Sequence, residues 1–191
     1  MAGIGINFSI SGIQDLQKMQ EILKPALFAK ALKGGMSYAA KGAKTAAAKE
    51  IGARYNLKAA RIKQDIRGPQ FLDGGATARL VFSRKPPSAL SYGGKDTGKG
   101  LRMKVLKSEG IKPVTRGFIG TGRIAGLPFR RVNAKGNQPI AFVSGPSIGS
   151  IFMGSGDNAQ VMQQIVSDRI NEQFVKGVER VLSAAARGYG I

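Results

Sequence analysis

The residues that first suggest chemistry lie in a glycine- and lysine-rich stretch from Gly93 to Gly100, which has the sequence GGKDTGKG. Its first seven positions match a phosphate-binding loop, in which backbone N–H groups and a lysine hold nucleotide phosphates. Gly100, however, stands where that loop needs a Ser or Thr hydroxyl for Mg²⁺, and a strand-like alternation follows instead of a helix. We therefore predict a flexible basic loop here and no nucleotide site.

Acid–base and metal chemistry lack their usual residues. The chain has no His and no Cys, and its central part holds four scattered carboxylates, Asp65, Asp73, Asp96 and Glu109. A two-metal nuclease needs several carboxylates converging on ions about 4 Å apart, and the spacing does not indicate such convergence. We predict a protein that is not an enzyme, with no catalytic residue, no metal and no cofactor.

Positive charge is the strongest functional signal. The formal net charge is +19, and residues 57–145 carry 18 Lys and Arg against four acidic residues, a balance of +14. Residues 1–56 contribute +5 and residues 146–191 contribute zero. This asymmetry indicates that the centre of the chain faces a polyanion or another acidic surface, while the two ends build and assemble the particle.

Eight basic residues are our candidates for contact with DNA or an acidic partner. They are Lys95, Lys99, Arg102, Lys104, Lys107, Arg123, Arg130 and Arg131. Two interpretations stay open: a solvated face that keeps an oligomer soluble, or phosphate contacts that are independent of base sequence and sensitive to salt. Few aromatic residues lie nearby, Tyr92, Phe118 and Phe129 at most, which argues against a dedicated single-strand binder.

These residues must be positioned by helices and strands, and the expected order of those elements along the chain predicts an α+β fold. We expect N-terminal helices with stops at Gly34-Gly35 and after Arg67, a central, mostly antiparallel sheet, and a long C-terminal helix packed on the sheet. Alternating apolar residues predict strands at 76–82, 101–105, 116–119, 128–132 and 139–143. The terminal helix has an apolar stripe that includes Val161, Ile165, Ile170 and Phe174. Residues 1–191 form one predicted domain, with an N-terminal arm over 1–10 and an extended basic loop over 85–100.

Two short segments are candidates for assembly. Ile4, Ile6 and Phe8 alternate as in an extended arm, which can either add to a neighbour's sheet edge or close the chain's own sheet. Gly145-Pro146-Ser147 precedes a short apolar turn, and its simplest interpretation is a strand stop followed by a helix cap, with any partner contact secondary.

Hydropathy places the protein outside membranes. No apolar run approaches the roughly 20 residues that a membrane span needs. The first residues, MAGIGINF, lack a basic region followed by a long apolar one, so we expect no secretion signal and synthesis in a cytoplasm.

The order of segments resembles the minor tail protein Z family of lambda-like long-tailed bacteriophages. The resemblance is patchy, spans roughly residues 25–185, and depends on the combined order of segments rather than on one motif. The segments that carry it are Ala39–Ile51, Tyr55–Lys63, Arg84–Leu90, Gly117–Gly120, Leu127–Arg131, Gln138–Ile140 and Gly145–Phe152. Residues 91–100 are more glycine-rich than the corresponding loop of that family.

The resemblance implies a tail completion or connector protein of the virion, made in the cytoplasm of a host bacterium. Such a protein acts at the head-proximal end of the tail, in tail assembly and head–tail joining. The implied partners are its own copies in a homo-hexameric ring, the tail terminator, the tail tube, the head-side connector and the tape measure protein. Genomic double-stranded DNA is an expected non-specific contact. The alternative from the residues alone is a sequence-independent DNA-binding protein that is not part of a virion.

Overall fold

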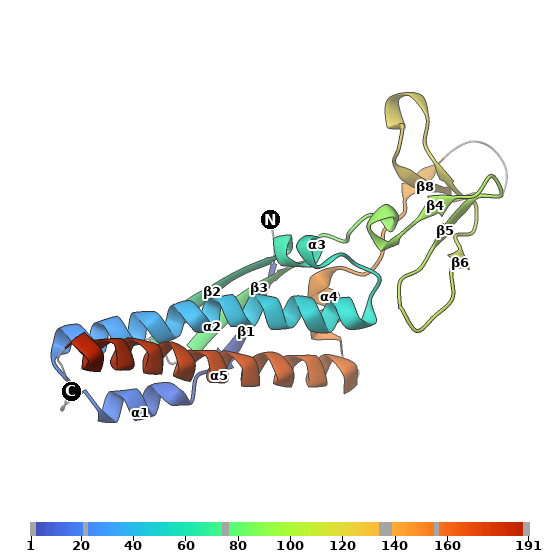
Figure 1. Cartoon of the computed structure of the whole chain (residues 1–191). Helices are drawn as coiled ribbons and strands as arrows, with labels where there is room; N and C mark the ends of the chain where they lie inside the picture. Colours follow the sequence, from blue (N-terminus) through green and yellow to red (C-terminus); the bar gives the residue numbers. More distant parts are fainter. Residues whose placement is uncertain (1–2, 21–22, 74–76, 134–138, 155–156, 189–191) are drawn as a thin grey trace.

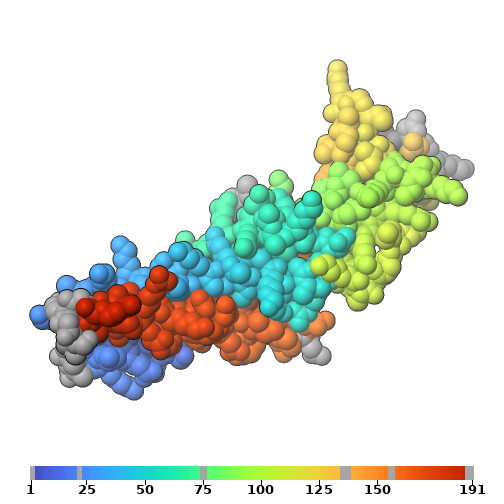
Figure 2. Space-filling model, in the orientation of Figure 1, coloured from blue at the N-terminus to red at the C-terminus, as the bar shows by residue number. Residues whose placement is uncertain are grey.

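The computed structural model describes residues 3–20, 23–73, 77–133, 139–154 and 157–188. The molecule is elongated: two long helices and a sheet form the larger part, and a smaller β-rich part projects from one end (Figures 1 and 2). We call residues 84–146 the basic lobe and the rest the body. The predicted α+β class, the antiparallel sheets and the long C-terminal helix are confirmed.

Two antiparallel helices form the frame of the body, α2 (Pro25–Arg54) and α5 (Asp157–Gly188) (Figure 1). The predicted stop at Gly34-Gly35 is wrong, because α2 continues through both glycines. The reason is packing, since a Cβ on Gly35 would lie 2.7 Å from the Phe174 ring. Glycine weakens a helix by about 1 kcal/mol, and here the close approach of α5 outweighs that cost.

The apolar stripe of α5 begins one residue away from its predicted position. Val161 and Ile165 are exposed by 47% and 37%, whereas Met162 and Val166 are buried. From Ile170 onward the prediction is confirmed. The predicted stripe contained a step of five residues, from 165 to 170, and at 3.6 residues per turn such a step leaves the starting face of a helix.

The body's sheet has three antiparallel strands in the order β1-β3-β2. Their bounds are β1 (Gly3–Ser9), β2 (Ile66–Leu72) and β3 (Thr77–Ser83). Short helices complete the body: α1 (Gly12–Lys18), α3 (Ala59–Gln64) and α4 (Ile148–Met153). One face of the sheet belongs to the same hydrophobic core as α2, α4 and α5, and Phe82 stacks on Phe152 with ring centroids 4.3 Å apart. The helix α5 packs chiefly along α2 and touches the sheet at β1.

The predicted helix through Arg67 is too long. The helix α3 ends at Gln64, and β2 begins two residues later. Ile66 pairs with Phe82 across the sheet and is buried there, so the core favours a strand over a further helical turn. Before α3, the Asn56 side chain donates from Nδ2 to the Tyr92 carbonyl oxygen at 3.0 Å.

The basic lobe contains two small antiparallel sheets, in the orders β4-β5-β6 and β7-β8-β9. The strands are β4 (Lys95–Asp96), β5 (Leu101–Met103), β6 (Lys112–Pro113), β7 (Gly117–Ile119), β8 (Pro128–Arg131) and β9 (Ile140–Phe142). One 3-10 turn, Ala89–Tyr92, precedes β4, and another, Gly122–Ile124, lies between β7 and β8. The predicted strands from 101 onward are therefore confirmed in position, while the predicted extended loop over 85–100 contains a 3-10 turn and the first strand of a hairpin.

Candidate functional site

The lobe is attached to the body around one buried aromatic side chain, Tyr92. Its hydroxyl donates to the Pro146 carbonyl oxygen at 2.6 Å, and a Cβ on Gly145 would lie 2.2 Å from the Tyr92 ring. Burial raises the pKa of Tyr92 well above its usual range, so the hydroxyl stays a neutral donor. Ser88 and Ser144 form a β-bridge beside it, which joins the two chain segments that connect the lobe to the body.

The lobe concentrates the charge of the chain. Residues 84–146 hold 13 Lys and Arg and two carboxylates, a balance of +11. Both carboxylates have local partners: Asp96 accepts from the backbone N–H groups of Gly98 and Ile119, and Glu109 forms an ion pair of 2.9 Å with Lys112. The excess cations therefore create a strong positive potential around the projecting part of the molecule.

Three predicted basic residues come together on the β4–β5 hairpin. Lys95 lies directly opposite Arg102, so both side chains share one face, and Lys99 is exposed in the turn between the strands. Like charges that are directly opposite on neighbouring strands repel and destabilise the pair. Asp96 does not offset this repulsion, because adjacent residues of a strand point to opposite faces. The hairpin therefore gathers three cations, of which Lys95 and Arg102 share one face.

The other five candidates are spread over the lobe. Lys104 and Lys107 lie where the lobe meets the body, and the Lys107 N–H donates to the Arg54 carbonyl oxygen at 2.8 Å. Arg123 is exposed in the 3-10 turn before β8. Arg130 and Arg131 are neighbours on β8 and therefore face opposite sides of that sheet. The eight candidates share one lobe but not one surface.

A row of phenylalanines on the second sheet was missed as a group by sequence reasoning. Phe118, Phe129 and Phe142 are register partners on β7, β8 and β9. The predicted strands each contain one of them, and an assumed antiparallel register would have aligned them. We call these three residues the Phe ladder. Tyr92, which the sequence offered as a stacking residue, is instead fully buried.

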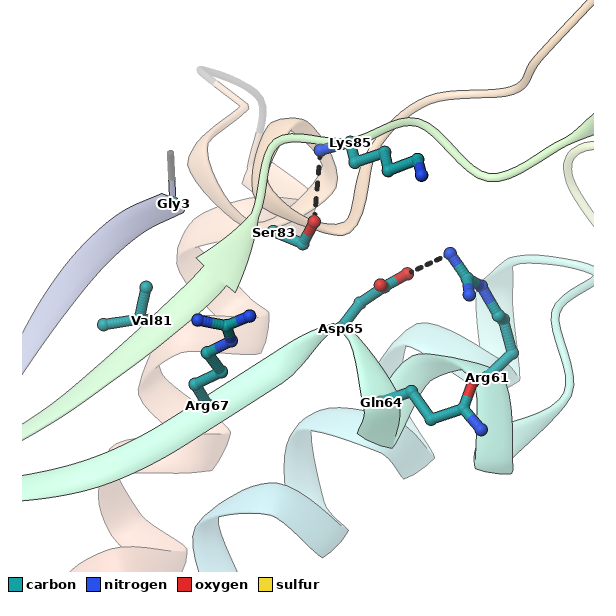
Figure 3. Close-up of a pocket in the computed structure, with 8 residues that line it drawn as sticks. All are labelled: Gly3, Arg61, Gln64, Asp65, Arg67, Val81, Ser83 and Lys85. Atoms are coloured by element: carbon teal, nitrogen blue, oxygen red, sulfur yellow. Dashed lines mark hydrogen bonds and ion pairs between the residues drawn. The ribbon is translucent and has the colours of Figure 1, made fainter. Parts of the chain in front are cut away.

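A pocket of about 220 Å³ lies at one end of the body's sheet, where strands β2 and β3 meet α3 (Figure 3). Arg61 and Asp65 form an ion pair across it at 3.0 Å, and Arg67 and Lys85 also line it. Burial raises the pKa of the Asp65 carboxyl, although Arg61 and Lys85 act in the opposite direction. Because Asp65 already has a cationic partner, the arrangement is explained as a structural ion pair at the edge of the sheet.

The four central carboxylates stay apart. Asp65 lies in this pocket of the body and Asp73 is exposed after β2, whereas Asp96 and Glu109 lie in the lobe and have separate partners there. Within the described ranges, no group of three or more acidic side chains could hold a metal ion. The same part of the chain contains no helix with the length and apolar character to cross a membrane.

The N-terminal arm closes the chain's own sheet. Ile4, Ile6 and Phe8 pair with residues of β3, and Phe8 is buried while the other two are half-buried. Phe8 belongs to the body's core and Ile6 packs against it. Of the two alternatives left open by the sequence, the structure therefore has the intramolecular one, and the outer edge of β1 remains unpaired within the described chain.

The segment Gly145-Pro146-Ser147 has the architectural role that its sequence predicts. Ser147 caps α4, because its Oγ accepts from the Ser150 N–H at 3.0 Å. Gly145 leaves room for the Tyr92 ring, which a larger residue would displace. The strand stop and helix cap are confirmed.

Searches among protein-family models, curated proteins and solved structures found no match for this chain. The fold and the charge define an α+β protein with a projecting basic lobe, and its function is inferred from those features.

Proposed function

We propose that the chain is a structural protein of a phage virion, a tail completion or connector protein at the head-proximal end of the tail. In this proposal the body assembles into a ring, and the basic lobe faces the DNA channel or an acidic neighbouring ring. The proposed partners are further copies of the chain in a homo-hexamer, the tail terminator and the tail tube, with the head-side connector, the tape measure protein and double-stranded DNA as additional contacts.

The observation that carries the proposal is that the positive charge is concentrated in the lobe, whereas the C-terminal part of the body has no net charge. The lobe has a balance of +11, whereas residues 146–191, which contain all of α5, have a balance of zero. A chain with this division can assemble through its body without bringing the lobe's cations into the interface. The resemblance in segment order supports the same class of protein, and neither feature requires catalysis.

A specific surface of the body suits assembly. Val161 and Ile165 are exposed on α5, and Ile165 lines a shallow groove between α2 and α5 together with Lys49, Asp168 and Arg169. This surface mixes apolar residues with charges of both signs, which is typical of protein–protein contact rather than of contact with a polyanion.

The oligomeric state at about 0.5 M salt tests the proposal, because that salt concentration screens phosphate-driven association. We expect a defined ring in light scattering, or co-sedimentation with purified tail components. The alternative, a DNA-binding protein outside the virion, predicts a monomer that binds duplex DNA at low salt and ignores tail components. That second result would overturn the proposal that the chain is a connector.

The assembly surface can be tested separately. Ile165→Asp places a charge in the exposed apolar patch of α5 and should prevent ring formation while the chain stays folded. Gln160→Asp adds the same charge at an exposed position of the same helix and should leave the ring intact. Equal behaviour of the two variants would place the interface elsewhere.

A further inference from the structure

The second sheet of the lobe presents a continuous aromatic row. Phe118 pairs with Phe129, and Phe129 pairs with Phe142, so all three side chains lie on the same face of the sheet. The ring centroids are 6.2 Å apart in the first pair and 5.9 Å apart in the second. The row thus crosses the full width of the three-stranded sheet.

This face is the outer one. The lobe's own core, Ala89, Leu101 and Val143, contacts Ile119, which lies on the face opposite to Phe118. Phe142 is 47% exposed, and the other two rings of the ladder are half-buried. Packing within the lobe therefore does not account for the aromatic character of this face.

A cationic side chain lies against the ladder. The Arg131 guanidinium lies over the Phe118 ring, 5.7 Å from its centroid, and the backbone N–H of Arg131 donates to the backbone carbonyl oxygen of Arg116. A guanidinium plane and phenyl rings both provide flat π-surfaces on which bases stack, and nearby cations attract the phosphates. Open sheets with aromatics on neighbouring strands bind unpaired bases in this way in RNA-recognition domains.

We propose that the Phe ladder is a stacking site for unpaired bases of single-stranded nucleic acid, a ligand class beyond the duplex contact of the connector proposal. The lobe's charge of +11 favours this occupant over an apolar protein segment, because such a segment would bury cations without neutralising them. The phosphates are attracted by the cations of the lobe, and the bases stack on the ladder without sequence preference.

The test compares three labelled 15-mers by fluorescence anisotropy with the full chain: oligo-dT, an abasic strand of equal phosphate number, and a duplex. We expect oligo-dT to bind more tightly than the abasic strand, since only the former offers bases. Phe142→Ala should weaken oligo-dT binding about 5- to 150-fold, the range for one stacked base, and leave duplex affinity unchanged. Ile111→Ala removes an exposed apolar side chain elsewhere in the lobe and serves as the control.

A spectroscopic arm separates stacking from general attraction. The chain has no Trp, so Phe142→Trp introduces a single indole, and stacking should quench its fluorescence on addition of oligo-dT but not of the abasic strand. Equal affinity for the two strands, or absence of quenching, would overturn the proposal. A change of oligomeric state in Phe142→Ala with unchanged oligo-dT affinity would also overturn it and assign the ladder to a protein interface. The binding and quenching measurements do not depend on ring formation, so they test the stacking site independently of the connector proposal.

Discussion

The clearest perturbation is the removal of charge from the β4–β5 hairpin by Lys95→Gln, Lys99→Gln and Arg102→Gln together. The slope of log affinity against log salt is negative, and each phosphate that the protein no longer neutralises makes it less steep by about 0.9 for duplex DNA. Three such phosphates therefore make the slope less steep by about 2.7. If the variant and the original chain converge at 1 M salt, this corresponds to an affinity about 170-fold weaker at 0.15 M. Lys104 is left intact because it is partly buried where the lobe meets the body.

The assay is duplex binding by fluorescence anisotropy between 0.05 and 0.4 M salt. A matched control replaces three exposed lysines of α2, Lys30, Lys33 and Lys41, with Gln and so removes the same formal charge from the body at positions outside the α2–α5 groove. We expect the control to change the slope by less than about 0.5, because long-range attraction is screened beyond a Debye length of about 8 Å at physiological salt. Equal weakening in the two variants would refute the reasoning, since net charge rather than its location would then govern binding.

Three further predictions concern the framework. Tyr92→Phe removes the hydroxyl that donates to the Pro146 carbonyl oxygen, which is then left without this partner. We therefore expect the free energy of unfolding in urea to decrease by about 1–3 kcal/mol. An unchanged urea midpoint would show that this hydrogen bond does not stabilise the fold. Gly35→Ala should destabilise by about 1–3 kcal/mol, because the added Cβ would meet the Phe174 ring, and a more stable variant would show that α2 and α5 separate easily. Ser147→Ala should lower stability by about 1 kcal/mol because it removes the cap of α4, with thermal unfolding as the measurement and an unchanged Tm as the contrary result.

Much of the lobe could be predicted from the sequence, because its strands are short, alternating and separated by glycines. The alternation of Leu101, Arg102 and Met103 predicted a strand at 101–105, and β5 covers its first three residues, with Leu101 buried and Arg102 exposed. Local alternation does not specify pairing. The opposition of Lys95 to Arg102 depends on register, and so does the alignment of Phe142 with Phe129.

Two errors in the body, the helix stop at Gly34-Gly35 and the helix through Arg67, have a common physical cause, which is that tertiary packing outweighs local propensity. Gly34-Gly35 has the composition of a helix stop, yet α5 approaches α2 there closely enough to exclude a Cβ at Gly35. Ile66 is one residue in a helix-compatible stretch, yet its burial opposite Phe82 ends the helix. Neither contact can be identified from a window of neighbouring residues, because the partners lie more than ten positions away along the chain.

The distribution of charge also constrains how such a chain could assemble. In the proposed hexamer the formal charge is 6 × 19 = +114, of which the lobes hold 6 × 11 = +66. Repulsion between bodies stays modest, because each body carries the remaining +8 over about twice as many residues as the lobe. Lobes converging on a common channel would repel strongly, since charges within a Debye length of about 8 Å are poorly screened. A ring held by its bodies would therefore keep its lobes apart until a polyanion enters, and the entering nucleic acid would draw them inward. On this reasoning DNA binding follows ring assembly instead of driving it, and the ring's stability should be nearly independent of salt while the order of its lobes depends on the presence of nucleic acid.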